Sequence, residues 1–251
     1  MKNKLHPIRA LALLILVLGS SMPIRGQDNA EPDKIVLGAK AGINDGLFRT
    51  NNGFSLWDRN SNTFGYQVGV YGIYPLKDFL KARLELLYVN QGAKLADYNY
   101  TGTVKNVNAK AHMNMLHIPL VAELGIPDFT GLIKPKLIVG GFYSYTFKVN
   151  STFEQDTYFA DGSNRTAHGR EDISGLFKHN QYGFIIGIGG EISLGGKPLL
   201  VELRYTHTLN NVGIDGFEYS YLGSTKYNKY GTGLYPTSLG LNVSYPIFNL
   251  N

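Results

Sequence analysis

The sequence has no cysteine, few prolines and no long apolar run after residue 18. Without cysteine the chain can form neither a disulfide framework nor a lipid-modified cysteine. A membrane-spanning helix needs about 20 consecutive apolar residues, so a helical span beyond residue 18 is excluded. The many glycines and tyrosines favour a β-rich chain instead.

A strong net charge is also missing once the first residues are set aside. The formal net charge is +5, but residues 1–26 carry Lys2, Lys4, Arg9 and Arg25 and no acidic residue. Removing these four charges leaves +1 for the rest of the chain. A nearly neutral chain lacks the basic footprint of a nucleic-acid-binding protein, so we expect no nucleic-acid partner.

The N-terminal residues predict export from the cytoplasm. A basic start is followed by an unbroken apolar run at residues 10–18 and by small residues up to Gly26. This order is typical of a secretory signal peptide, and the run is too short to cross a bilayer as a helix. We therefore expect a signal peptide at residues 1–26, a short polar leader at 27–33 and one domain at 34–251.

Residues 182–210 predict two strands joined at Gly195 and Gly196. Large apolar residues alternate there with glycines and charged residues. Because successive side chains of a strand point to opposite faces, each strand has one apolar face. Similar alternation predicts six more strands, at residues 35–43, 63–74, 80–91, 113–124, 134–148 and 234–248.

The predicted connections alternate in length along the chain. Long polar loops are expected at residues 44–62, 92–112, 149–178 and 211–233, with short connections between the other strands. An even number of strands with this alternation is typical of an outer-membrane barrel. The predicted fold class is all-β, an eight-stranded antiparallel up-and-down transmembrane β-barrel in the cell outer membrane, in contact with outer-membrane lipid.

In such a barrel lipid covers the apolar face and the lumen is polar. Nine charged residues have lumen-facing parity: Lys40, Lys81, Arg83, Glu85, Glu123, Lys136, Glu191, Glu202 and Arg204. Charges of both signs in one narrow interior should pair, since an unpaired buried charge is costly. The interior of eight strands is just filled by side chains, so we expect a plugged lumen.

Apolar residues with inward parity leave two interpretations open: they pack around the charges, or they mark an error of register. They are Leu87, Val89, Val121, Ile138, Phe142 and Ile185.

Aromatic residues are expected in belts at the two membrane interfaces. The outer belt would contain Phe64, Tyr66, Tyr88, Tyr145, Phe147, Tyr182 and Tyr235, and the inner belt Tyr74 and Tyr245. Four further aromatic residues fall in long loops: Trp57, Phe153, Tyr158 and Phe159. They are candidate contacts for protein partners, or they belong to a loop that folds over the barrel mouth.

No catalytic, cofactor or metal site is expected. Residues 204–210 resemble the Arg-x-x-His-x-Ser-Asn pattern of outer-membrane lipid A deacylases, but Leu209 stands at the serine position and His207 has lipid-facing parity. The nucleophile of that pattern is therefore missing. His112 and His117 fall on opposite faces of one strand, and the acidic residues of the third loop lack calcium-loop spacing.

Several strand patterns resemble the PorT-like outer-membrane β-barrel family of Bacteroidetes. The residues that carry the resemblance are at 84–88 with 91–94, 117–120, 134–135 with 140–143, 183–191 and 202–205. The resemblance implies an outer-membrane protein without enzymatic activity. The namesake of that family is needed for the type IX secretion system, which exports proteases and adhesins. No site residues of the family can be carried over.

The favoured interpretation is a non-enzymatic outer-membrane barrel that is an accessory component of protein secretion or envelope assembly, with proteins of those systems as its partners. A structural or adhesive barrel with ligand-binding loops is the alternative. A lipid A-modifying enzyme is the third.

Overall fold

A computed structural model describes residues 35–50, 63–98, 104–126, 131–158, 161–194, 197–213, 218–221, 224–227 and 234–250. The described residues all belong to one compact unit, residues 34–251. The predicted signal peptide and leader lie outside them, as do Trp57 and Phe159.

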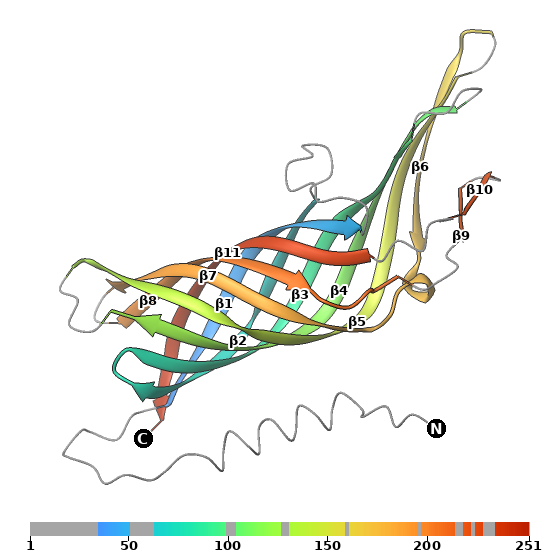
Figure 1. Ribbon diagram of the computed structural model, residues 1–251. Helices are drawn as coiled ribbons and strands as arrows, with labels where there is room; N and C mark the ends of the chain where they lie inside the picture. Colours follow the sequence, from blue (N-terminus) through green and yellow to red (C-terminus); the bar gives the residue numbers. More distant parts are fainter. Residues whose placement is uncertain are drawn as a thin grey trace, which may run out of the picture. The chain divides into compact units, whose positions relative to one another are not determined.

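Eight antiparallel strands form a closed ring (Figure 1). They are β1 (Ile35–Thr50), β2 (Thr63–Lys77), β3 (Leu80–Tyr98), β4 (Val104–Gly125), β5 (Ile133–Tyr158), β7 (Asn180–Leu194), β8 (Lys197–Thr208) and β11 (Leu234–Leu250). Each pairs with the next of the eight along the chain, and β1 pairs with β11 to close the ring. The predicted eight-stranded barrel is therefore confirmed.

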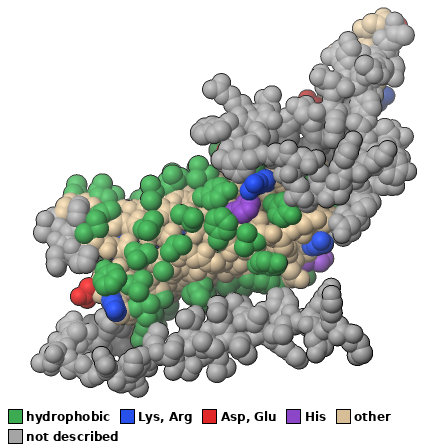
Figure 2. All heavy atoms as spheres, viewed as in Figure 1, with side chains coloured by type: hydrophobic (Ala, Val, Ile, Leu, Met, Phe, Trp, Pro, Cys, Tyr) green, Lys and Arg blue, Asp and Glu red, His purple; other side chains and the backbone are tan. Residues whose placement is uncertain are grey.

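The faces of the strands are reversed relative to a soluble barrel. On β3, for example, Arg83 and Glu85 are buried, whereas Leu84 and Leu86 are exposed by 56% and 48%. Figure 2 shows hydrophobic side chains covering the barrel wall, with the few charged and histidine side chains in view lying toward its ends. Such a surface suits contact with lipid. Among the described residues, no helix is long and apolar enough to span a membrane.

The two ends of the barrel differ. At one end, the short-turn end, Asp78 and Phe79 join β2 to β3, and residues 195–196 join β7 to β8. β1 also begins and β11 ends there. We call the opposite end, which carries the longer excursions of the chain, the long-loop end.

Several strands are longer than the sequence predicted. β3 and β4 continue through much of residues 92–112, which were wrongly predicted to be a loop. β5 likewise continues into the predicted third loop, where it pairs with β6 (Asn164–Asp172). Beyond the lipid both faces of a strand meet water, so the backbone ladder continues without the apolar alternation on which the prediction depended.

These additions form a sheet beyond the barrel, which we call the sheet extension. It consists of residues 92–98 of β3, 104–112 of β4, 149–158 of β5, and β6. Figure 1 shows β4 and β5 running past the ends of β1 and β11, with β6 beside β5. The fourth predicted loop contains a small hairpin, β9 (Glu218–Tyr221) and β10 (Ser224–Tyr227).

Candidate functional site

Six charged side chains meet inside the lumen, and we call them the charge cluster. They are Lys40 of β1, Arg83 and Glu85 of β3, Glu123 of β4, and Glu202 and Arg204 of β8. None is more than 3% exposed. With three cations and three anions the cluster is formally neutral, which is the condition for burying so many charges.

The guanidinium groups of Arg83 and Arg204 connect the carboxylates of the cluster. Arg204 donates two hydrogen bonds to Glu85, Nη1 to Oε2 at 3.0 Å and Nη2 to Oε1 at 2.6 Å. Arg83 Nη2 lies 2.6 Å from Glu202 Oε2. Lys40 Nζ lies 3.2 Å from Glu85 Oε2 and also contacts Glu202. These charge-assisted bonds connect β1, β3 and β8 across the lumen, and two-point arginine contacts fix their geometry.

Arg83 is also held by the strands beside it. Its Nη1 lies 2.7 Å from Glu123 Oε1 on β4. Its guanidinium lies over the Tyr71 ring of β2, 5.9 Å from the ring centroid. Gly38 of β1 makes space for that ring, because a Cβ at this position would overlap the Tyr71 side chain. The absence of a side chain at position 38 therefore helps to position Arg83.

Three predicted lumen charges lie outside the cluster. Lys136 of β5 and Glu191 of β7 form a separate ion pair, with Nζ 3.2 Å from Oε2 and side chains exposed by 10% and 20%. Lys81 lies opposite Glu123 in the register of β3 and β4 and is partly exposed. The structure thus brings six of the nine predicted residues into one network.

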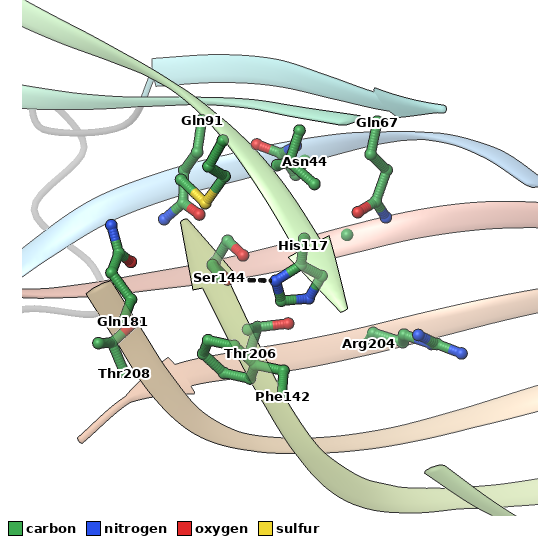
Figure 3. A pocket seen from close by; sticks show the side chains of 14 residues that line it. Asn44, Gln67, Gln91, His117, Phe142, Ser144, Gln181, Arg204, Thr206 and Thr208 are labelled. Atoms are coloured by element: carbon green, nitrogen blue, oxygen red, sulfur yellow. Dashed lines mark hydrogen bonds between the residues drawn. The ribbon is translucent and has the colours of Figure 1, made fainter. Parts of the chain in front are cut away.

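Uncharged polar side chains lie next to the charge cluster, toward the long-loop end (Figure 3). His117 Nδ1 lies 2.6 Å from Ser144 Oγ, and Gln181 Nε2 donates to Thr146 Oγ1 at 2.7 Å. His117, Ser144 and Gln181 line a cavity of about 20 Å³, into which about one water molecule fits. Asn44 also lines this cavity, and its buried Oδ1 has no hydrogen-bond partner among the described residues.

A hydrophobic cap closes the lumen at the long-loop end. Its buried residues are Leu87, Val89, Ala111, Met113, Met115, Val149, Ile173, Phe177 and Val212. Ile173 and Phe177 flank the short helix η1 (Ser174–Leu176), and Val212 follows β8. The inward apolar residues of β3 thus pack into this cap, and the second group, Val121, Ile138, Phe142 and Ile185, forms its own lumenal cluster. Packing around the polar groups, and not an error of register, explains their parity.

Backbone hydrogen bonds fix the cap segments to the barrel. Ile173 N donates to Val149 O at 2.9 Å, and Val149 N donates to Ser174 Oγ at 2.8 Å. Val212 N donates to Leu234 O at 2.9 Å, while Val212 O accepts from Lys178 N at 2.7 Å. The cap is therefore built from paired backbone as well as apolar side chains.

Hydrogen bonds within its own turn lower the pKa of Asp172, an aspartate next to the cap. Asp172 Oδ1 accepts hydrogen bonds from the backbone N of Ser174 at 3.0 Å and from its Oγ at 2.6 Å. These bonds stabilise the ionised form and hold the pKa of the exposed Asp172 carboxyl below its usual range. The turn leads directly into Ile173 of the cap.

His117 and Ser144 are of the types found in base and nucleophile pairs. Both are buried, since His117 is 7% and Ser144 0% exposed. They lie between the charge cluster and the cap, so the described residues leave no wide path from either end for a substrate. Their hydrogen bond satisfies two buried polar groups, which is its evident structural effect.

The described residues contain no group of three side chains suited to a metal ion. His117 points into the lumen, and His112 has the opposite parity on β4, as the sequence predicted. Phe153 and Tyr158 lie within β5 and not in a loop, and their side chains are outside the described part of the structure.

Aromatic side chains form belts on the outer wall. Near the long-loop end, Tyr66 and Tyr88 have ring centroids 5.9 Å apart, and Phe147 follows 6.1 Å from Tyr88. Near the short-turn end, Tyr245 is 40% exposed and lies under the ammonium group of Lys197, 5.6 Å from it. Such belts match the two interfaces of a membrane.

Comparison with protein families supports the same architecture. Residues 26–213 match the family described as outer membrane protein beta-barrel domain. The chain belongs to this family. The match and the lipid-facing wall place the protein in the cell outer membrane, and the topology rule for these barrels puts the long-loop end outside the cell. No curated protein matches the sequence.

Solved structures of outer-membrane proteins are similar to the chain in fold. The attachment invasion locus protein Ail of Yersinia pestis is 8% identical, with 86% of this chain and 100% of that chain covered and a TM-score of 0.38. OprG from Pseudomonas aeruginosa is 11% identical, with 87% and 98% covered and a TM-score of 0.39. A major outer membrane protein from Thermus thermophilus is 12% identical, with 84% and 99% covered and a TM-score of 0.41.

Sequence reasoning missed the uncharged lumenal residues and the cap segments. Ser144, Thr146 and Gln181 have lumen parity, so alternation within their strands could have identified them. Ile173, Phe177 and Val212 lie in irregular segments, where no periodicity reveals which side chains are buried.

Proposed function

We propose that this protein is a non-enzymatic outer-membrane barrel that acts through contacts with other proteins, as an accessory component of secretion or envelope assembly. The observation that carries the proposal is the combination of a lumen filled at both ends with a sheet that continues beyond the barrel. A filled lumen disfavours transport by diffusion, and a projecting sheet offers contact area outside the membrane.

The sheet extension has the geometry of a binding platform. Among the described strands, β6 pairs only with β5, so its other edge presents backbone N–H and C=O groups. An exposed sheet edge can accept a further strand from a partner chain. The side chains of β6 are nearly all exposed, including Arg165, His168 and Arg170. A partner peptide in extended conformation fits this edge.

Secretion is the favoured process because of the resemblance to the PorT-like family. The test is a clean deletion strain in which the culture supernatant, the periplasm and the cell surface are compared for exported cargo. Cargo trapped in the periplasm behind an intact outer membrane supports the proposal. Normal export, without co-purification of any secretion component, overturns the secretion role.

An adhesive role is the second candidate, favoured by the outward direction of the sheet extension. Lys94 pairs with Lys110 and Thr152 pairs with Arg170, so two tight turns at these pairs would remove most of the extension and keep the barrel register and the cap residue Ala111. Loss of surface binding with normal export would favour adhesion, whereas loss of export would favour secretion. A barrel in which residues 51–62 are replaced by a Gly/Ser linker of equal length is the matched control.

The proposed lack of enzymatic activity is tested by a separate experiment. His207 lies on the outer wall and Leu209 replaces the serine of the deacylase pattern. We expect the mass of lipid A to be the same in the deletion and parent strains. A shifted lipid A mass that returns with the wild-type gene would overturn this part of the proposal.

A further inference from the structure

A group of aromatic, histidine and arginine side chains lies on the outer wall near the long-loop end. It consists of Arg49 of β1, Tyr205 and His207 of β8, and Phe184 of β7, with the buried Thr237 of β11 opposite His207, and we call it the rim patch. The patch takes no part in the lumenal network, because these residues have the lipid-facing parity of their strands.

Strand register places His207, Thr237 and Phe184 in one row around the wall, with Tyr205 one lipid-facing position nearer the short-turn end. Thr237 is opposite His207 in the β11–β8 ladder, and His207 is opposite Phe184 in the β8–β7 ladder. Arg49 stands one lipid-facing position farther out on β1 than Leu47, which is opposite Thr237. The row therefore covers the three adjacent strands β11, β8 and β7, and Arg49 extends the patch to β1.

Its position is the boundary of the apolar band. One or two lipid-facing positions nearer the short-turn end, the wall carries exposed apolar residues, namely Ile186, Leu203, Leu239 and Leu241. The row thus lies where hydrocarbon gives way to headgroups, and the long-loop end assigns it to the outer leaflet.

The three rings make a platform centred on His207. The Tyr205 and His207 rings are stacked, with centroids 6.2 Å apart and planes 6° apart, and the Phe184 centroid lies 5.3 Å from that of His207. His207 Nδ1 lies 3.0 Å from the buried Thr237 Oγ1. This bond fixes the ring and leaves Nε2 as the nitrogen that a ligand can reach.

Arg49 supplies the charge. It is exposed and lies opposite Tyr235, two positions along β11 from Thr237, which is opposite His207. An arginine beside a ring platform at headgroup depth combines two recognition elements: a guanidinium for phosphate, and rings for the apolar face of a sugar. A purely hydrophobic anchor would require neither the arginine nor the oriented imidazole.

We propose that the rim patch is a binding site for a phosphorylated glycolipid of the outer leaflet. The guanidinium of Arg49 and Nε2 of His207 contact the phosphate, and the Tyr205 and Phe184 rings pack against the sugar. The inference concerns the barrel wall and is independent of the proposed partner binding by the sheet extension.

Lys197 offers a matched control at the other end of the barrel. Its ammonium group lies 5.6 Å from the Tyr245 ring centroid, so it is also a cation beside an aromatic ring on the wall. It lies at the short-turn end, facing the inner leaflet. Lys197→Ala removes the same charge without altering the rim patch.

The experiment measures lipid A retained by the purified full-length barrel, by native mass spectrometry from mixed micelles. The barrels are wild type, Arg49→Ala, Arg49→Glu, His207→Ala and Lys197→Ala. A basic residue near a charged lipid surface contributes enough for about a fivefold change in binding. We expect Arg49→Ala to lower retention by about fivefold, Arg49→Glu to lower it further, and Lys197→Ala to leave it unchanged.

Lipid A without its phosphates is the second probe, and inorganic phosphate is the third. Dephosphorylated lipid A should bind the wild type and Arg49→Ala equally, and inorganic phosphate should not displace bound lipid A at millimolar concentration. Equal retention of phosphorylated lipid A by wild type, Arg49→Ala and Arg49→Glu would overturn the proposal, as would an equal loss in Lys197→Ala. Because Arg49 is exposed, its variants test the site even where His207→Ala fails to fold.

Discussion

At the scale of single residues, the arrangement of side chains inside this barrel depends on ion pairs between opposite charges. Each charged group of the cluster contacts a group of opposite charge. Arg83, for example, contacts three carboxylates, those of Glu85, Glu123 and Glu202. Removing one member of such a set leaves the remaining buried charges unbalanced, which costs more than the intact set contributes. Stability should therefore respond sharply to single substitutions here and weakly at the barrel rim.

We expect Arg83→Met to lower the free energy of unfolding by about 3–5 kcal/mol, because three buried carboxylates lose a shared cation. Urea unfolding in lipid vesicles measures the change. Lys136→Met is the control, since its ion pair with Glu191 lies apart from the cluster and is partly solvated, and we expect about 1 kcal/mol or less. Equal effects of the two substitutions would contradict this account of the cluster.

The Asp172 turn predicts a pH dependence at the cap. Its pKa is lowered in the folded protein, so its stabilisation is present above about pH 4 and is lost as the pH falls through the depressed value. Asp172→Ala should speed amide hydrogen exchange of residues 173–178 at pH 7, relative to intrinsic rates. The difference from wild type should shrink toward pH 2.

Asp161→Ala is the matched control for this prediction. Asp161 accepts the same pair of hydrogen bonds from Ser163, from the backbone N at 2.9 Å and from Oγ at 2.6 Å, in the connection between β5 and β6. It should leave exchange of residues 173–178 unchanged. A difference between Asp172→Ala and wild type that persists undiminished at pH 2 would show that the carboxylate charge is irrelevant.

At the scale of elements, the cap depends on segments that have little regular structure of their own. Residues 173–178 and 209–213 meet through the Phe177–Gly213 bridge and through Lys178 N and Val212 O. Their stability comes from apolar side chains packed onto β3, β4 and β5, and a segment with few such contacts opens separately from the barrel.

Phe177→Ala should therefore open the cap without unfolding the barrel. Truncating a buried phenylalanine costs about 3–5 kcal/mol, which exceeds what a short segment can lose while remaining closed. Limited proteolysis should cut the variant between β6 and β7, whereas the urea midpoint of the barrel stays within error. Leu209→Ala is the control, because this side chain is 55% exposed, and it should resist cleavage like the wild type.

At the scale of the whole molecule, the lumen of the barrel is filled at two levels. The hydrophobic cap fills the long-loop end of the lumen, and the charge cluster crosses it nearer the short-turn end. In the part of the chain that the structure describes, a cavity of about 20 Å³ lies among the polar side chains between them. Two independent closures make the barrel a scaffold for its outer surfaces, in keeping with the proposed function through protein contacts.

Liposome swelling with small sugars should therefore show no transport by the wild type. The variant Phe177→Ala should also be inactive, because the charge cluster remains. The double variant Phe177→Ala/Arg83→Ala disrupts both the hydrophobic cap and the charge cluster. We expect swelling only for this double variant. Swelling by the wild type at rates typical of a porin would refute the closed-lumen description.

Much of the architecture followed from alternation of residue types. The eight strands, their lipid-facing residues and the lumen-facing charges such as Lys40 and Glu202 were predicted, because a period of two is a local property of the chain. The ends of β3, β4 and β5 were not, because strands surrounded by water need no apolar face. The cap residues Ile173 and Phe177 carried no periodic signal at all.

The sequence by itself determined a set of strands with apolar outer faces and a charged interior, because each property depends on composition or on neighbouring residues. Only the tertiary structure decided which charges meet: Lys40 and Glu202 contact each other from strands 162 positions apart in the chain. It also decided that the lumen is capped and that the sheet extends past the barrel. Ring closure and strand register set these contacts, and neither is encoded in a local pattern.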